Sequence, residues 1–85
     1  MVRRERAFRG ISTRLVVQYL EGLGGEADGE RRVVGPDWTV DIDTEVVTIT
    51  SSIQLTEVQL TFEGDEETLD ELIPTFAQKA MRAGG

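Results

Sequence analysis

The residues with the clearest chemical potential are the two glycines at the end of the sequence, Gly84 and Gly85. Glycine has no Cβ atom, so a Gly-Gly backbone can pass through a narrow channel and bring its carboxylate to a nucleotide phosphate. An activating enzyme could then adenylate the Gly85 carboxylate, which would attack the α-phosphate of ATP. Such activation requires a flexible tail before the two glycines.

A structural explanation of the same glycines competes with this one. Glycine just beyond the last turn is the commonest way for a helix to end. Residues 65 to about 82 have the pattern of a helix, and only Ala83 separates that helix from Gly84. Extended residues span roughly 3.5 Å each, so the tail would be short. We therefore favour a helix-ending role and keep activation at Gly85 as the alternative.

An arginine cluster near the start of the chain is a second candidate for binding. Residues 1–14 contain five arginines and one glutamate, whereas residues 15–85 contain four basic and fifteen acidic residues. Four of the arginines could dock an acidic protein, a nucleotide or a nucleic acid: Arg3, Arg4, Arg6 and Arg9. Nucleic-acid-binding domains are usually basic and offer stacking aromatic side chains, but this chain has a net charge of −7. We expect the arginines to pair with the protein's own acidic surface, and we do not expect nucleic-acid binding.

The composition argues against several kinds of chemistry. The chain has no cysteine and no histidine, which removes thiol and imidazole nucleophiles and the common zinc sites. Nearly all acids fall on polar faces, and Lys79 lies off the apolar stripe of the last helix, so neither a carboxylate pair nor a reactive amine is indicated. Four acids could hold a hard cation but lack the spacing of a calcium loop: Asp37, Asp41, Asp43 and Glu45. We predict no catalytic residues, no cofactor and no metal site.

The overall charge and hydropathy also suggest the cellular environment of the protein. Only one of the nine basic residues is a lysine, and the chain is acidic. This bias is typical of proteins from a high-salt cytoplasm, where ions screen the repulsion between acidic side chains. No apolar run reaches the roughly 18 residues of a membrane span, and the basic start lacks the apolar stretch of a signal peptide. We expect a soluble, cytoplasmic protein with one domain, residues 1–85.

The first part of the chain predicts a strand followed by a helix. Residues 3–9 have little to bury and read as a short edge strand. Residues 11–23 carry apolar side chains at three- and four-residue steps, which predicts a helix capped by Ser12 or Thr13. Residues 26–30 read as a polar connector.

The middle of the chain predicts a sheet. Alternating apolar and polar residues are typical of antiparallel strands with one covered face and one face in water. We expect a tight turn at Thr44 and Glu45, so that Val47 and Ile49 in the next strand point inward. The predicted strands are residues 31–34, 38–43, 46–50 and 56–63.

The end of the chain predicts a second helix, capped by Asp65, with a kink or a restart at Pro74. The complete pattern predicts an α+β fold with two layers, in which two helices cover one face of an antiparallel sheet. The expected element order is β-α-β-β-β-β-α.

The second face of this sheet is our candidate interaction surface. It would be polar and rich in threonine, with Val46 as its one apolar point, and the basic first strand could extend it. The residues predicted on this surface are Thr39, Asp41, Val46, Thr48, Thr50, Gln59 and Thr61.

Three segments of the chain resemble a known module. They are residues 18–26 (QYLEGLGGE), 60–67 (LTFEGDEE) and 81–85 (MRAGG). They are similar to the C-terminal domain of proteins related to MoaD, the small subunit of molybdopterin synthase, in which a β-grasp sulfur carrier precedes an uncharacterised module. The resemblance implies a TATA-binding-protein-like fold. The β-grasp half is not among these 85 residues, so its carrier role is not carried over.

The resemblance and the residues together predict a function class. We expect a non-enzymatic protein that acts by protein–protein contact in the molybdopterin or ubiquitin-like sulfur-carrier system. The implied partner is a β-grasp sulfur carrier or its activating enzyme. The alternative is a ubiquitin-like modifier or sulfur carrier that is itself activated at Gly85.

Overall fold

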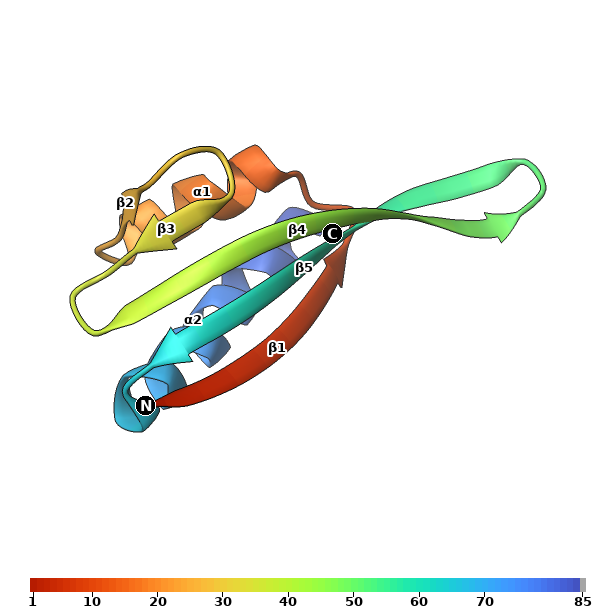
Figure 1. Cartoon of the computed structure of the whole chain (residues 1–85). Helices are drawn as coiled ribbons and strands as arrows, with labels where there is room; N and C mark the ends of the chain where they lie inside the picture. The colour runs from red at the N-terminus through yellow and green to blue at the C-terminus, as the bar shows by residue number, and fades with distance from the viewer. Residues whose placement is uncertain (85) are drawn as a thin grey trace.

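The protein forms one antiparallel five-stranded sheet with two helices against one of its faces, as seen in a computed structural model that describes residues 1–84 (Figure 1). The strands lie in the order β1-β5-β4-β3-β2. This confirms the α+β class with an antiparallel sheet, and the TATA-binding-protein-like arrangement stays a prediction. The elements are β1 (Val2–Arg9), α1 (Thr13–Gly22), β2 (Glu26–Ala27), β3 (Arg32–Val34), β4 (Trp38–Thr50), β5 (Ile53–Gly64) and α2 (Glu66–Gly84).

Both helices have the caps that the sequence predicts, although α1 begins at Thr13 and not at residue 11. The Ser12 hydroxyl accepts a hydrogen bond from the Leu15 amide at 3.2 Å, which caps α1. The Asp65 carboxylate accepts one from the Thr68 amide at 3.3 Å, which caps α2. Each cap satisfies an amide that has no partner within its own helix.

Helix α2 runs through Pro74 as one helix, so the predicted restart is wrong. Proline removes one backbone donor from the helix. Its neighbours Ile73 and Phe76 are buried against the sheet, and this packing holds the helix to the sheet on both sides of Pro74. A kink at Pro74 stays a prediction.

The core lies between the helices and the sheet, with Phe76 near its centre. The Phe76 ring makes edge-to-face contacts with Phe8, Tyr19 and Phe62, at centroid distances of 5.3, 6.3 and 6.2 Å. Within the described residues, no polar or charged side chain is buried. None of the described helices is apolar over the length needed to cross a membrane.

The largest departure from the sequence prediction is the length of the β4–β5 hairpin. β4 continues without a turn through Thr44 and Glu45, which pair with Val58 and Glu57 of β5. The chain turns instead at Ser51 and Ser52. The predicted turn is wrong: Thr44 and Glu45 are extended residues in the middle of β4 and continue its pairing with β5. The predicted connector also contains a strand, β2, which pairs with β3.

The tip of this hairpin forms an arm, residues 46–56, that projects from the body of the protein (Figure 1). β1 pairs with β5 only as far as Glu57, and β3 pairs with β4 only as far as Asp41. No helix covers the arm in Figure 1. Val47 and Ile49 therefore do not join the core as predicted: Val47 is half-buried and Ile49 is exposed.

Candidate interaction surface

The face of the sheet opposite the helices, called the open face here, is polar. The side chains of Val40 and Leu60 are buried beneath the helices, so their strand neighbours point the other way. Asp41 and Thr61 are direct cross-strand partners on this face. The structure brings together four of the predicted surface residues: Thr39, Asp41, Gln59 and Thr61.

The other three predicted residues lie elsewhere. β4 does not turn at Thr44 and Glu45. The side chains of Val46 and Thr48 therefore point in the same direction as that of Val40, to the helix side of the strand. They lie beyond the helices, in the arm, and Thr50 follows a shift in strand register at the arm's tip. The seven residues therefore do not form one surface.

Polar contacts hold the side chains at the middle of the open face. Glu45 and Glu57 are opposite one another, which would place two negative charges side by side. The Gln59 amide bridges them, donating to Glu45 at 3.0 Å and to Glu57 at 3.4 Å. The Arg9 guanidinium donates to Glu57 at 3.1 Å. Hydrogen bonds from Arg9 and Gln59 hold the pKa of Glu57 below its ordinary value.

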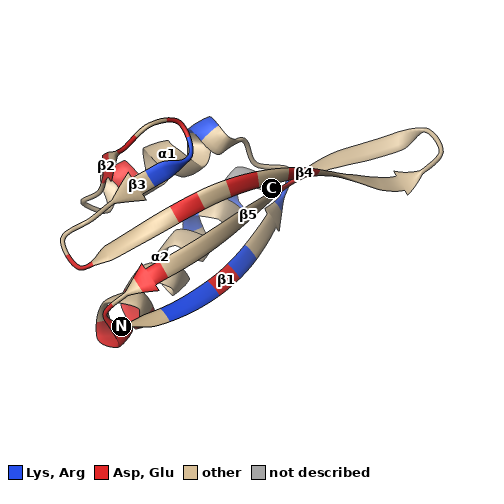
Figure 2. Ribbon diagram, viewed as in Figure 1, with Lys and Arg blue, Asp and Glu red and all other residues tan. Residues whose placement is uncertain are grey.

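The acids of β4 also have basic neighbours. Asp41 lies 3.7 Å from Arg32, and Asp43 lies 3.5 Å from Arg31. Figure 2 shows acidic positions along β4 and basic positions along β1. No group of three or more acids that could hold a metal ion occurs within residues 1–84.

The four arginines of β1 do not form a single docking patch. Strand alternation places Arg3 and Arg9 on the open face, and Arg4 and Arg6 on the helix side. Arg3 pairs with Glu5 at 3.3 Å.

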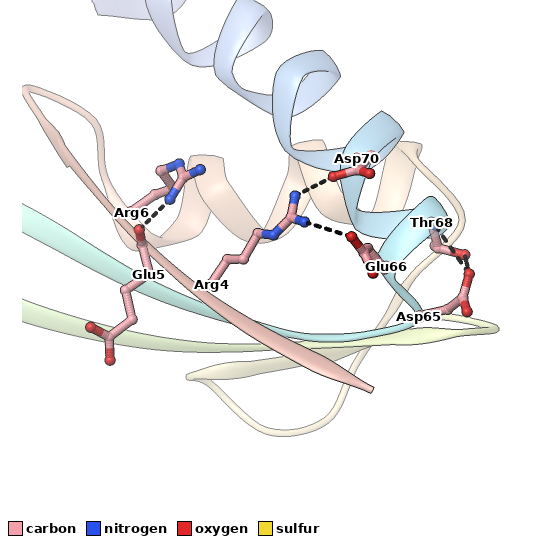
Figure 3. A network of polar contacts seen from close by, with 7 residues as sticks. All are labelled: Arg4, Glu5, Arg6, Asp65, Glu66, Thr68 and Asp70. Atoms are coloured by element: carbon pink, nitrogen blue, oxygen red, sulfur yellow. Dashed lines mark hydrogen bonds and ion pairs between the residues drawn. The ribbon is translucent and has the colours of Figure 1, made fainter.

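The two helix-side arginines have partners close by in Figure 3. Arg4 forms an ion pair with Asp70 and lies 4.0 Å from Glu66, both on α2. Arg6 donates to the backbone carbonyl of Glu5 at 2.7 Å. The expected pairing with the protein's own acids is confirmed for Arg3, Arg4 and Arg9.

A shallow hollow marks the open face between β1 and β5. Ala7 lines this hollow and is opposite Gln59, while Glu5 is opposite Thr61. The small Ala7 side chain leaves space between longer neighbours. The hollow is therefore a place on the open face where a partner's side chain could be received.

The structure describes only the first of the two terminal glycines. Gly84 is the last residue of α2 rather than a residue beyond the helix, so the helix is longer than predicted. Ala80, one turn earlier, is buried. Gly85 lies outside the described residues.

The sequence analysis missed the apolar side chains exposed on the arm. The affected residues are Val46, Ile49, Ile53 and Leu55. Two signals in the sequence could have identified them. Residues 46–56 contain no charged residue, and the Ser51-Ser52 pair lies at the middle of this run.

Comparison with known proteins agrees with the resemblance noted above. A search of curated proteins gives no match. A sequence model of a family described as archaeal MoaD-like protein matches residues 4–85. The chain therefore belongs to the archaeal MoaD-like protein family.

Proposed function

We propose that the protein is a non-enzymatic accessory protein of the sulfur-carrier or molybdopterin system. It binds a protein partner, either a β-grasp sulfur carrier or the enzyme that activates such a carrier. Membership of the archaeal MoaD-like family supports an association with this system.

The observation that carries the proposal is the open face, which no helix covers. Its side chains are held in place by contacts within the sheet, as the bridge from Gln59 to Glu45 and Glu57 illustrates. Side chains that are already ordered lose little conformational entropy when a partner binds. The hollow at Ala7 would receive a protruding side chain of the partner, and the Glu5 carboxylate in its lining favours a basic one.

The lowered pKa of Glu57 supports a role in binding rather than in catalysis. A general acid near neutral pH needs a carboxyl group whose pKa is raised by burial or by like charge. Glu57 has the opposite shift, since Arg9 and Gln59 favour its charged form. The sequence offers no cysteine or histidine in place of a carboxylate.

The proposal is tested by placing the same substitution on two faces of the protein. Gln59→Arg adds a long basic side chain to the open face, where Glu45 and Glu57 can accept it. Gln78→Arg is the matched control on the exposed side of α2. We expect Gln59→Arg to weaken binding to the carrier or to its activating enzyme by about tenfold or more, and Gln78→Arg to leave it unchanged. Equal affinities for both variants would exclude the open face as the binding surface.

A second candidate function is activation of this chain itself at Gly85, and the family match extends over both terminal glycines. In that reaction the Gly85 carboxylate attacks the α-phosphate of ATP and pyrophosphate leaves. A sulfur donor then replaces AMP and leaves a thiocarboxylate. The helical state of Gly84 argues against it, because the enzyme would have to unwind the end of α2.

Mass spectrometry after incubation with the activating enzyme, ATP and a sulfur donor separates the two functions. Replacement of one oxygen by sulfur at Gly85, which is lost when Gly84 and Gly85 are deleted, would establish the carrier role. An unchanged mass, together with intact partner binding by the deletion variant, is the result expected for an accessory protein.

A further inference from the structure

The arm formed by residues 46–56 exposes apolar side chains that a folded protein usually covers. Val46, Ile49, Ile53 and Leu55 are 62%, 48%, 51% and 41% exposed. Val47 and Leu55 are cross-strand partners, so they lie on the same side of the arm. Val46 points to the other side of the arm. Several exposed apolar side chains gathered on one short segment of a small protein indicate a site of association.

The arm is also incomplete as a sheet. Seven of its eleven residues are valine, isoleucine or threonine, which favour strands. It nevertheless consists of only two strands, and a two-stranded ribbon with neither face covered is marginal in water. A third strand alongside the arm would stabilise it.

The outer edge of β4 is free to accept that strand. The amide of Ile42 donates to the carbonyl of Arg31 at 2.7 Å, and β3 pairs with β4 no further toward the tip than Asp41. Natural sheet edges are usually protected by lysine, proline or inward-pointing charge. Residues 46–50 of β4 carry none of these. The register with β5 shifts between Thr48 and Thr50, and the backbone groups of this edge are otherwise open to pairing.

The charge distribution allows a second copy of this protein to supply that third strand. The chain carries a net charge of −7, but residues 46–56 are uncharged, and Figure 2 shows the arm without acidic or basic positions. Two copies of this protein repel one another through their bodies. The arm lets them meet without placing acid against acid, because the long axis of the molecule, 42 Å against 24 and 22 Å, keeps the bodies apart.

A two-fold pairing of the β4 edges would bring the same uncharged segment of each copy together. In an antiparallel pair centred on Thr48, residues 46–50 of one copy lie along residues 46–50 of the other, and each copy carries the shift in register between Thr48 and Thr50. This contact is self-complementary, as a symmetric dimer requires.

We propose that the arm is a dimerisation element, in which two copies of this chain pair through residues 46–50 of β4 to form a continuous four-stranded ribbon. The contact is smaller than the roughly 800 Å² per partner of a stable complex, so the dissociation constant of the dimer is micromolar or higher. Salt strengthens it, because ions screen the repulsion between the acidic bodies.

The proposal is tested by measuring molar mass between about 10 μM and about 1 mM protein, at low and at high salt. We expect the mass to rise from one chain toward two, and to do so at lower concentration in high salt. Ile49→Lys places a charge in the paired edge and should keep the protein monomeric. Val34→Lys makes the same change in net charge at an exposed apolar residue of the body and should still dimerise. A mass of one chain throughout, or equal dimerisation of both variants, would overturn the proposal.

Disulfide crosslinking tests the register, because the chain has no cysteine of its own. Paired residues of antiparallel strands lie about 4.5 to 5.5 Å apart at their Cα atoms, which is within reach of a disulfide. Thr48→Cys should therefore form a covalent dimer under mild oxidation much faster than Thr61→Cys on the open face. Equal rates for the two variants would contradict edge pairing centred on Thr48. Circular dichroism of each variant confirms that its fold is retained.

Discussion

Arg4 of β1 forms an ion pair with Asp70 of α2, which follows it by 66 positions in the chain. The Arg4 side chain is only 28% exposed. The pair joins the edge strand to the final helix on the covered side of the sheet (Figure 3). This contact adds to the pairing of β1 with β5 and to the packing of Phe8 against Phe76 in holding β1 to the fold.

Replacing Arg4 should destabilise the protein more than replacing its neighbour Arg3. Arg4→Ala removes contacts with Asp70 and Glu66 and also the packing of the arginine stem. We expect the free energy of unfolding to fall by about 1 kcal/mol, the upper end for partly exposed pairs. Arg3→Ala removes an exposed pair with Glu5 and should cost at most a few tenths of a kcal/mol, that is, about 0.3. Urea denaturation measures both, and equal losses would argue against a role for Arg4 in docking β1 to α2.

The pKa of Glu57 predicts how stability depends on acid. Hydrogen bonds from Arg9 and Gln59 lower this pKa from its ordinary value of 4.5 in the folded protein. A lowered folded-state pKa contributes stability above the unfolded-state pKa, and this contribution is lost as the pH falls through the folded-state pKa. Nuclear magnetic resonance titration should give a midpoint for Glu57 below 4.5.

The variant Arg9→Gln provides the control for this titration. It removes the first cause of the shift, so the Glu57 pKa should rise toward its ordinary value. The variant should also lose less stability than the natural protein when the pH is lowered below 4.5. A Glu57 midpoint that is the same in both proteins would refute the assigned cause.

The helix starts and most of the covered sheet could be predicted from the sequence because their signals are local. Ser12 and Asp65 cap the residues that directly follow them. Around Val40 and Ile42, apolar residues alternate with polar ones, and the apolar ones are those buried under the helices. The partner of each arginine could not be predicted, since Arg4 and Asp70 are brought together only by the folded chain.

The arm could not be predicted in the same way, because nothing covers it. Where both sides of a strand meet water, alternation no longer reports which side is buried. A turn placed at Thr44 and Glu45 instead of Ser51 and Ser52 changes the face assigned to every later residue of β4. This is why Val46 and Thr48 were assigned to the wrong side of the strand.

The packing of Trp38 makes Gly35 a sensitive position. A Cβ atom at Gly35 would overlap the indole ring of Trp38, which is 5% exposed. Gly35→Ala should therefore displace the ring, shift its fluorescence to longer wavelength and lower the free energy of unfolding by about 1–3 kcal/mol. Gly22→Ala is the control, because a Cβ there meets no neighbouring atom and alanine favours the helix. Unchanged fluorescence in Gly35→Ala would contradict the packing of Trp38.

The acidic surface predicts that salt stabilises the folded protein. Two effects oppose each other, because ions weaken pairs such as Arg4 with Asp70 while they screen the repulsion within a chain of net charge −7. The pairs are partly exposed and contribute up to about 1 kcal/mol each, whereas the repulsion acts on all sixteen acids. Screening should therefore dominate, and the melting temperature should rise between about 0.1 M and about 1 M potassium chloride. The rise should disappear near pH 4.4, where the net charge of the chain is close to zero and there is little repulsion to screen. A melting temperature that is independent of salt at neutral pH would refute adaptation to a high-salt environment, since the repulsion would then be too small to matter.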